Sequence, residues 1–278
     1  RTIALSADNA IQNGKNSSFI YKFPNSVVFD DEEVAVASLN LFYSWNNISA
    51  ELGNNTFQYS WSADGTTFTN YTVVLPDGLW EIDTINKYLE YTFIQNGHYL
   101  KSGNDNVYYA KFSVNATYYS IQLDTFPVPT SLGSLTNPDN MTLPTTSFNP
   151  SIILSTSSKF YEVIGFASNF TSSTTPNTAS YLSTTSPQVQ KNANVLVSCS
   201  NINNIYANPS TIIYSFSPNV PIGGQIVEKP PQLQWNKLST GTYNELRIDF
   251  LNTNFQQINI RDPQISILLC IKSAKSPY

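Results

Sequence analysis

The sequence contains few charged residues and no long apolar run. Asp, Glu, Lys and Arg make up 12% of its 278 residues, about half of the usual share. The net charge is −5 and the lysines and arginines are scattered, so the chain lacks the basic surface that nucleic-acid binding requires. No apolar stretch approaches the roughly 20 residues of a transmembrane helix. We therefore expect neither sequence-specific nucleic-acid binding nor a membrane span.

Catalytic and cofactor motifs are also missing. His98 is the only histidine, and its setting in "QNGHYL" favours a packing or surface role over a catalytic one. No serine stands in a Gly-x-Ser-x-Gly elbow, and no glycine-rich loop ends in Lys-Ser or Lys-Thr. The "IGG" at 222–224 lacks the strand-then-helix setting of a phosphate-binding loop and predicts a turn. We expect no catalytic residue, no cofactor-binding residue and no metal ligand, and hence no enzyme.

Three groups of residues have competing interpretations. Cys199 and Cys270 each adjoin a strand-like run, which favours buried free thiols over a single disulfide. The run "DDEE" at 30–33 favours a solvated turn that keeps a strand edge from pairing, with a calcium site as the alternative. The tryptophans adjoin apolar strands or the expected helix start, which favours packing over sugar-stacking platforms. These are Trp45, Trp61, Trp80 and Trp235.

Seven Asn-x-Ser/Thr sequons would suit a secreted protein, but most arise by chance in a chain so rich in Asn and Thr. They lie at Asn16, Asn47, Asn54, Asn70, Asn115, Asn140 and Asn169.

Alternating apolar and polar residues predict β-strands along most of the chain. Strands are expected at 2–5, 19–23, 34–43, 194–199, 211–217 and 233–238. Residues 56–75 predict a hairpin around Asp64-Gly65, and 107–123 predict another around Asn115-Ala116. Within 34–43 one face would be shared by Ala35, Ala37, Leu39, Leu41 and Tyr43. This spacing is typical of an all-β sandwich or barrel.

One segment has helical spacing instead. Apolar residues recur every three to four positions from Ile82 to Phe93, with Asp83 as the expected N-cap and Asn96-Gly97 as the stop, which predicts a helix over about 83–95. A helical turn is expected within 158–166. Residues 124–150 and 171–194 are rich in Pro, Ser, Thr and Asn and predict long loops. We expect a single domain over 1–278 with these loops as insertions.

The chain ends in two strong strand patterns. Leu246, Ile248 and Phe250 alternate with the charged Glu245, Arg247 and Asp249, so the apolar three are expected in a core. In the last strand the core face would hold Ile265, Ile267, Leu269 and Ile271. Its other face, with Leu268 and Cys270, would be covered by a loop, the helix or a neighbouring subunit.

Several segments, in order, resemble the small jelly-roll capsid protein of Polinton-like viruses, virophages and related elements. They are "TIALSADN", "FIYKFPNSVVFDDEEVAVASLNLFYSWNNIS", "LPDGLWEIDTINKYLE", "FYEVIGF", "VLVSCSNINNIYANPSTIIYSFSPNVPIGGQI" and "NELRIDFLNTNFQQINIRDPQISILLCIK", the last similar to the family's final hairpin. The resemblance covers nearly the whole chain except the two expected loops.

The resemblance implies a jelly-roll β-sandwich and a penton or minor capsid protein. Such a protein forms homopentamers at the fivefold vertices of an icosahedral virion, beside major capsid proteins built as double-jelly-roll trimers, and assembles inside the infected cell. Two alternatives stay open at this point. A secreted carbohydrate-binding or adhesive β-sandwich would fit the sequons and aromatic residues. A glycoside-cleaving enzyme would need two carboxylates about 5 to 9 Å apart in an aromatic groove, and nothing in the sequence picks out such a pair.

Overall fold

The chain forms two compact units rather than the single domain that the sequence led us to expect. In this computed structural model, which describes all residues except 12–13, 189–193, 222 and 275–278, unit 1 comprises residues 1–46 and 192–278 and unit 2 comprises 47–191. Each unit has its own hydrophobic core, and no buried apolar residue belongs to both. Unit 2 is therefore an insertion that builds its own core, not a set of loops on one domain.

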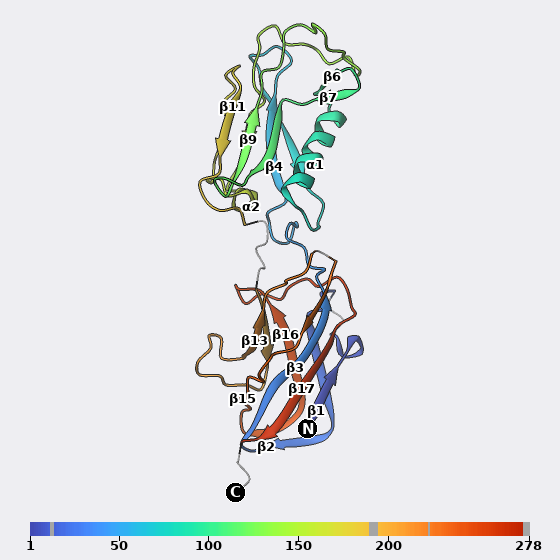
Figure 1. Ribbon diagram of the computed structural model, residues 1–278, viewed down its shortest axis with the longest axis vertical. Helices are drawn as coiled ribbons and strands as arrows, with labels where there is room; N and C mark the ends of the chain where they lie inside the picture. Colours follow the sequence, from blue (N-terminus) through green and yellow to red (C-terminus); the bar gives the residue numbers. More distant parts are fainter. Residues whose placement is uncertain (12–13, 189–193, 222, 275–278) are drawn as a thin grey trace. The chain divides into compact units, whose positions relative to one another are not determined.

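Unit 1 consists of two antiparallel sheets (Figure 1). The first has the order β1-β17-β3-β14 and is built from Thr2–Leu5, Ser266–Ser273, Glu32–Phe42 and Gln225–Glu228, and the short β15 (Asn236–Lys237) also pairs with β3. The second has the order β13-β12-β16-β2 and is built from Ile212–Phe216, Val195–Cys199, Gly241–Leu251 and Ser18–Phe29. A 3-10 turn, η1 (Ala7–Asn9), lies between β1 and β2.

The strand order identifies unit 1 as a jelly roll. When these eight strands are numbered along unit 1, the two sheets read 1-8-3-6 and 2-7-4-5. Successive strands therefore alternate between the sheets, except for the fourth and fifth, which pair with each other, as in the double Greek-key arrangement. Unit 2 is inserted between the third strand, β3, and the fourth, β12. The predicted all-β jelly-roll fold is thus confirmed for unit 1.

Three connections meet at one end of the jelly roll, which we call the turn end. They are the β2–β3 turn, the β12–β13 connection and the β15–β16 connection. Glu33 at the start of β3, Asn204 of the β12–β13 connection and Ser239 of the β15–β16 connection line one hollow. The inserted segment leaves after the opposite end of β3, where Phe42 pairs with Gln225.

The face pattern predicted for 34–43 is only half right. Leu39, Leu41 and Tyr43 enter the core as expected, but before them Val34 and Val36 join the core cluster rather than Ala35 and Ala37. Ala35 is nevertheless fully buried. The register with β17 shifts here: Leu268 pairs with Ser38 and the next residue, Leu269, pairs with Val36. The extra residue, Ala37, is a β-bulge, and a bulge reverses which face successive side chains occupy.

The closing strands fill the core as predicted but do not form a hairpin. Leu246, Ile248 and Phe250 are 0% exposed, and the expected residues of the last strand are also buried. However, β16 pairs with β2 and β12, whereas β17 pairs with β1 and β3 in the other sheet. On the outer face of β17, Leu268 remains 37% exposed, so the rest of the described chain does not cover it.

Unit 2 is a small sandwich with one long helix. One three-stranded sheet has the order β10-β4-β5 (Ile152–Ile153, Thr56–Trp61, Thr69–Val74), and the other has the order β11-β9-β8 (Ala179–Leu182, Ser120–Thr125, Ala110–Asn115). A small hairpin, β6–β7 (Leu100–Ser102, Asp105–Val107), completes its strands among the described residues. The two sheets meet through aromatic rings: Phe57 of β4 contacts Phe112 of β8, with ring centroids 5.8 Å apart.

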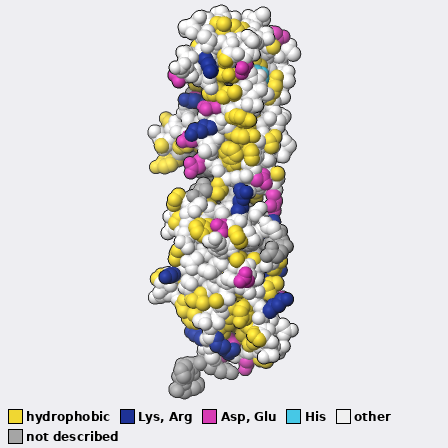
Figure 2. Space-filling model, turned by 90° about the vertical axis from the view of Figure 1, so that its right-hand side faces the viewer, with side chains coloured by type: hydrophobic (Ala, Val, Ile, Leu, Met, Phe, Trp, Pro, Cys, Tyr) yellow, Lys and Arg dark blue, Asp and Glu magenta, His cyan; other side chains and the backbone are white. Residues whose placement is uncertain are grey.

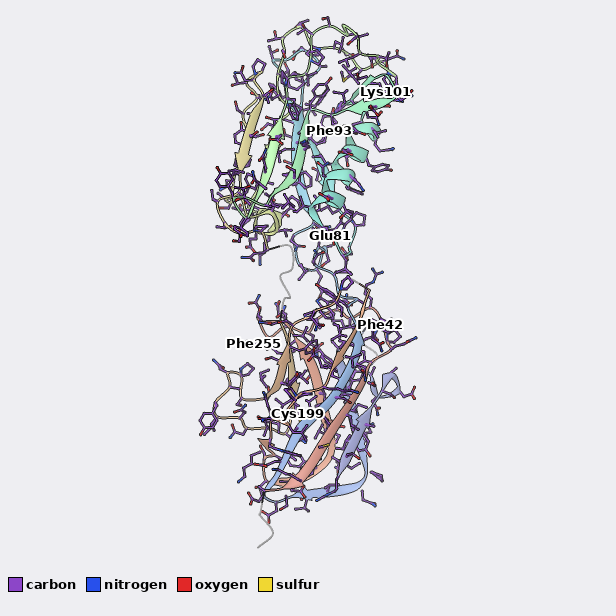
Figure 3. The ribbon with its side chains drawn as sticks, viewed as in Figure 1. Phe42, Glu81, Phe93, Lys101, Cys199 and Phe255 are labelled. Carbon is purple, nitrogen blue, oxygen red and sulfur yellow. The ribbon has the colours of Figure 1, made fainter. Side chains whose placement is uncertain are left out.

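The predicted helix is confirmed as α1, Ile82–Gln95, with Asn96 as its C-cap. Its N-cap is Glu81 rather than Asp83, because the side chain of Thr84 accepts a hydrogen bond from the Glu81 amide at 2.9 Å. Phe93 points from α1 toward the strands (Figure 3) and contacts Tyr59, with centroids 4.8 Å apart. Asn86 of α1 also protects the edge strand β8 by accepting a hydrogen bond from the Phe112 amide at 2.8 Å.

Other local predictions are confirmed with shifted boundaries. The helical turn is α2, Phe160–Ile164, and both predicted hairpins form, as β4–β5 and β8–β9. The loop predicted over 171–194 contains β11, which pairs with β9, and its residues 189–193 lie outside the described ones. Of the predicted "IGG" turn, residue 222 is likewise not described, and Gly223 has a φ of 78° and donates its amide proton to the Tyr43 carbonyl at 2.9 Å.

The hairpin turn at Asp64-Gly65 yields a first prediction. Gly65 has a φ of 82°, and a Cβ placed there would lie 1.8 Å from the carbonyl oxygen of Thr146. Gly103, in the β6–β7 turn, has a φ of 62° but nothing within 4 Å of such a Cβ. We expect Gly103→Ala to lower the free energy of unfolding by about 1 kcal/mol and Gly65→Ala by at least about 2 kcal/mol, measured by urea titration. Equal losses would show that the Thr146 backbone moves aside freely.

Candidate functional site

The cysteines are free thiols, as predicted. Cys199 is buried in β12 (Figure 3), and Cys270 is partly buried in β17. Burial raises the pKa of the Cys199 thiol to about 12. A thiol with so high a pKa stays protonated at neutral pH, so Cys199 serves as a packing residue.

The acidic run at 30–33 forms ion pairs at the turn end, between β2, the outermost strand of its sheet, and β3, which lies between β17 and β14. That the run keeps an edge from pairing stays a prediction. Lys237 Nζ lies 2.8 Å from Asp31 Oδ1, Lys272 Nζ lies 3.3 Å from Glu33 Oε2, and Arg1 pairs with Glu32. Among the described residues, no group of three or more His, Cys, Asp or Glu side chains is placed to hold a metal ion.

The turn end also exposes large apolar side chains. Ile205 and Tyr206, at the tip of the β12–β13 connection, are 76% and 94% exposed. They border a hollow of about 620 Å³ that Trp235 also lines, and Lys272 Nζ sits 4.3 Å from the centre of the Trp235 ring. Such exposure of Ile and Tyr side by side is typical of a surface that another molecule covers.

Two of the sequons are structural. Asn54 is 1% exposed, donates to the Asn47 carbonyl at 2.9 Å and accepts from the Ser49 amide at 2.9 Å. Asn47 is 7% exposed, and its Nδ2 donates to the Trp80 carbonyl at 2.7 Å. A side-chain nitrogen that is buried and hydrogen-bonded cannot carry a glycan in the folded state, so these two sequons give no support to a secreted protein.

The predicted packing role of the tryptophans is confirmed for two of them. Trp45 is 1% exposed in the core of unit 1 and Trp61 is 5% exposed in that of unit 2. Trp80 is partly buried and donates from Nε1 to the Pro76 carbonyl at 2.8 Å. None of these three tryptophans exposes a whole ring face on which a sugar could stack.

His98 lies at the wall of a cavity in unit 2. The cavity measures about 500 Å³ and is lined by the β4–β5 hairpin, by residues 96–98 and by residues 139–142. The imidazole stacks on Trp61, with centroids 4.3 Å apart and 8° between the planes, and meets Tyr71 edge-on at 4.7 Å. Only 7% of His98 is exposed, and a small part of it reaches the surface (cyan in Figure 2).

A chain of hydrogen bonds fixes the imidazole. Asn96 Nδ2 donates to the Tyr59 hydroxyl oxygen at 2.8 Å, and that oxygen lies 2.9 Å from His98 Nδ1. Burial lowers the pKa of His98 to about 4, so the ring is neutral at pH 7. The sequence-based packing role is thus correct, but the sequence did not indicate that this histidine borders a cavity, because its partners lie in another strand and after the helix.

Of the two carboxylates that line this cavity, Asp64 and Asp139, Asp64 is not suited to be a general acid. Asp64 Oδ1 accepts hydrogen bonds from the amides of Thr66 and Thr67 at 2.8 and 2.7 Å and from the Ser62 hydroxyl at 2.8 Å. These bonds hold the pKa of Asp64 well below its usual range. A carboxyl that acts as general acid in glycoside cleavage needs a raised pKa, so Asp64 does not suit that role.

On the face shown in Figure 2, lysines and arginines are interspersed with acids, with no large area of one sign. This face therefore gives no electrostatic footprint for nucleic acid. Within the described ranges, neither helix has the length and apolar character needed to cross a bilayer.

Comparison with known proteins finds similarity among solved structures. No protein-family model and no curated protein match the chain. The chain is similar to the mavirus penton protein, with 10% identity, 98% of each chain covered and a TM-score of 0.48. It is also similar to a chain in the 3.5 Å cryo-EM structure of the Sputnik virophage, with 13% identity, 98% of each chain covered and a TM-score of 0.41.

Proposed function

We propose that this chain is a structural capsid protein of an icosahedral virus, a penton protein that forms a homopentamer at the fivefold vertex beside a double-jelly-roll major capsid protein. Its place is the virion, assembled inside the infected cell, and its role there is not enzymatic. The observation that carries the proposal is the jelly roll of unit 1, because four of the six segments that resemble small viral capsid proteins lie in it. Those four segments contain all or part of each of the eight strands that form its two sheets, from β1 to β17.

The surface of unit 1 supports a role in assembly. A closed ring of identical subunits needs two different, complementary patches on each subunit. The turn end offers one candidate in Ile205 and Tyr206, and the outer face of β17 offers another in the exposed Leu268. The first patch places two apolar side chains beside the ion pairs of the turn end, and the second is an apolar side chain on an exposed strand face. Subunit interfaces likewise combine apolar side chains with a polar rim.

Light scattering on the purified chain tests the proposal directly. A pentamer of a 31.0 kDa chain has five times that mass, about 155 kDa, and negative-stain images of the same fraction should show five-membered rings. If only monomers appear, the chain is mixed with the major capsid protein of the same virus, and pentamers should then form. A stable trimer, or no association in either experiment, would contradict the vertex role.

Substitution at the turn end should weaken the pentamer. Burying Ile and Tyr at an interface contributes about 1.5 to 3 kcal/mol per side chain, so Ile205→Ser with Tyr206→Ser should raise the dissociation concentration by at least about tenfold. The matched control is Tyr118→Ser with Tyr119→Ser at the β8–β9 turn of unit 2, where the two rings are 65% and 81% exposed. We expect the control to leave the mass distribution unchanged. The reverse result would place the self-contact in unit 2.

A further inference from the structure

The cavity beside His98 is a built site that the capsid role does not use. Its three walls come from separate parts of unit 2: the β4–β5 hairpin, the end of α1, and the loop at 139–142. Its volume of about 500 Å³ falls within the range of small-molecule sites. All residues that line the cavity lie in unit 2. The binding of an occupant would therefore not depend on the assembly that unit 1 forms.

Hydrogen bonding determines which nitrogen of His98 carries the proton. The Tyr59 hydroxyl has one hydrogen, and its oxygen already accepts from Asn96 Nδ2 at 2.8 Å. The hydroxyl satisfies its own hydrogen by donating to His98 Nδ1, 2.9 Å away. The neutral ring then carries its proton on Nε2.

The Nε2–H group is a donor without a protein acceptor. His98 is 7% exposed, and among the described residues the only hydrogen-bond partner of its imidazole is Tyr59, at Nδ1. Nε2 is nevertheless not one of the fully enclosed unpaired atoms, and His98 lines the cavity, so we infer that Nε2 opens on it. A nearly buried donor held in place by two further side chains calls for an acceptor on an occupant.

The other lining groups define the chemistry of that occupant. Asp64 and Asp139 line the cavity, and no lysine or arginine does, so an anion would be repelled. A cation would be repelled by the Nε2–H donor, because it offers no acceptor. A neutral molecule with hydroxyl groups suits the donor and the carboxylates alike, because a hydroxyl accepts from Nε2–H and donates to a carboxylate. Tyr71, half-buried on the edge strand β5, adds an aromatic surface for C–H groups.

We propose that this cavity binds a neutral saccharide residue. A sugar hydroxyl oxygen accepts a hydrogen bond from His98 Nε2, a second hydroxyl donates to the Asp139 carboxylate, and the apolar face of the sugar packs on Tyr71. His98 and Tyr71 are positioned by Tyr59, which stacks on Tyr71 with centroids 5.3 Å apart and hydrogen-bonds His98.

Saturation-transfer NMR on the full chain tests the proposal. The probes are the methyl glycosides of glucose, galactose, mannose and N-acetylglucosamine, with N-acetylneuraminic acid as an anionic comparator and choline as a cationic one. We expect at least one neutral glycoside to receive saturation, with a dissociation constant on the order of millimolar, and neither comparator to do so.

Variants then locate the site. Asp139→Ala removes an exposed side chain and Tyr71→Ala a half-buried one on an edge strand, so both should fold, and each should weaken binding about tenfold. His98→Asn keeps a polar group near Tyr59 and removes the Nε2 donor, with the same expected loss. Tyr91→Ala is the matched control, because Tyr91 lies on α1, is 52% exposed and does not line the cavity. This variant should bind like the native chain.

Three results would overturn the proposal. The first is that no neutral glycoside receives saturation. The second is that Asp139→Ala and Tyr71→Ala both bind as tightly as the native chain. The third is that choline or N-acetylneuraminic acid binds more tightly than every neutral glycoside, which would assign the cavity to a charged ligand.

Discussion

Replacing Phe250 by alanine is expected to lower the free energy of unfolding of unit 1 by about 4 kcal/mol. The ring is 0% exposed on β16 and contacts Phe19 of β2 edge-on, with centroids 5.9 Å apart. Truncating a buried Phe removes its transfer free energy and leaves a cavity between the two sheets, at a combined cost of about 3 to 5 kcal/mol. The lost edge-to-face contact adds to this cost.

The matched substitution in the other unit is Phe93→Ala, which removes an equally buried ring from α1. Because the two hydrophobic cores share no residue, we expect two unfolding transitions, of which each variant shifts one. Urea titration followed by limited proteolysis can separate them, since the fragments released identify the unfolded unit. A single transition that both variants shift equally would contradict the independence of the cores.

Lowering the pH from 6.5 to 4 is expected to remove about 3 kcal/mol of stability from unit 2 through His98 alone. The pKa of the buried imidazole is lowered to about 4, whereas an unfolded histidine titrates near 6.5. Below pH 6.5 the unfolded chain therefore gains a proton that the folded chain does not, and stability falls with pH. Above pH 6.5 His98 is neutral in both states and unit 2 keeps its full free energy of unfolding. About 3 kcal/mol of that free energy is lost as the pH falls from 6.5 to 4.

The test is the free energy of unfolding of unit 2 as a function of pH, compared between the native chain and His98→Asn. The variant has no group that titrates at this position, so the difference between the two curves isolates the histidine from the acids. In the folded protein the pKa of Asp64 lies well below its usual range, and its linkage to unfolding is the same in both proteins, so it cancels in the difference. Parallel curves between pH 4 and 6.5 would show that His98 is readily protonated in the folded state.

The sequence predicted the faces of strands better than their partners. In β16 the alternation of Leu246, Ile248 and Phe250 with charged residues is enough to predict which face is buried, because successive side chains of a strand point to opposite faces. It cannot report which sheet a strand joins, so β16 and β17 looked like a hairpin although they lie in opposite sheets. Nor can it reveal the bulge at Ala37, where one extra residue reverses the pattern halfway along β3.

The two units escaped prediction for a different reason. The boundary between Asn46 and Asn47 has the same polar, Asn-rich composition as the loops on either side, and no run of Gly, Ser or Pro marks it. The cavity was equally hidden: Tyr59, Asn96 and His98 become a hydrogen-bonded chain only when β4 packs against the end of α1. Local periodicity carries no information on such long-range contacts.

The insertion between β3 and β12 has a consequence for the order in which the protein folds on the ribosome. Unit 2 is one continuous segment, so it can fold as soon as residue 191 has emerged. The jelly roll cannot, because Thr2 pairs with Cys270 and every strand made before the insertion needs partners made after it. Unit 2 should thus be folded while β1, β2 and β3 are still unpaired, and assembly into larger structures can begin only after β17 has been translated.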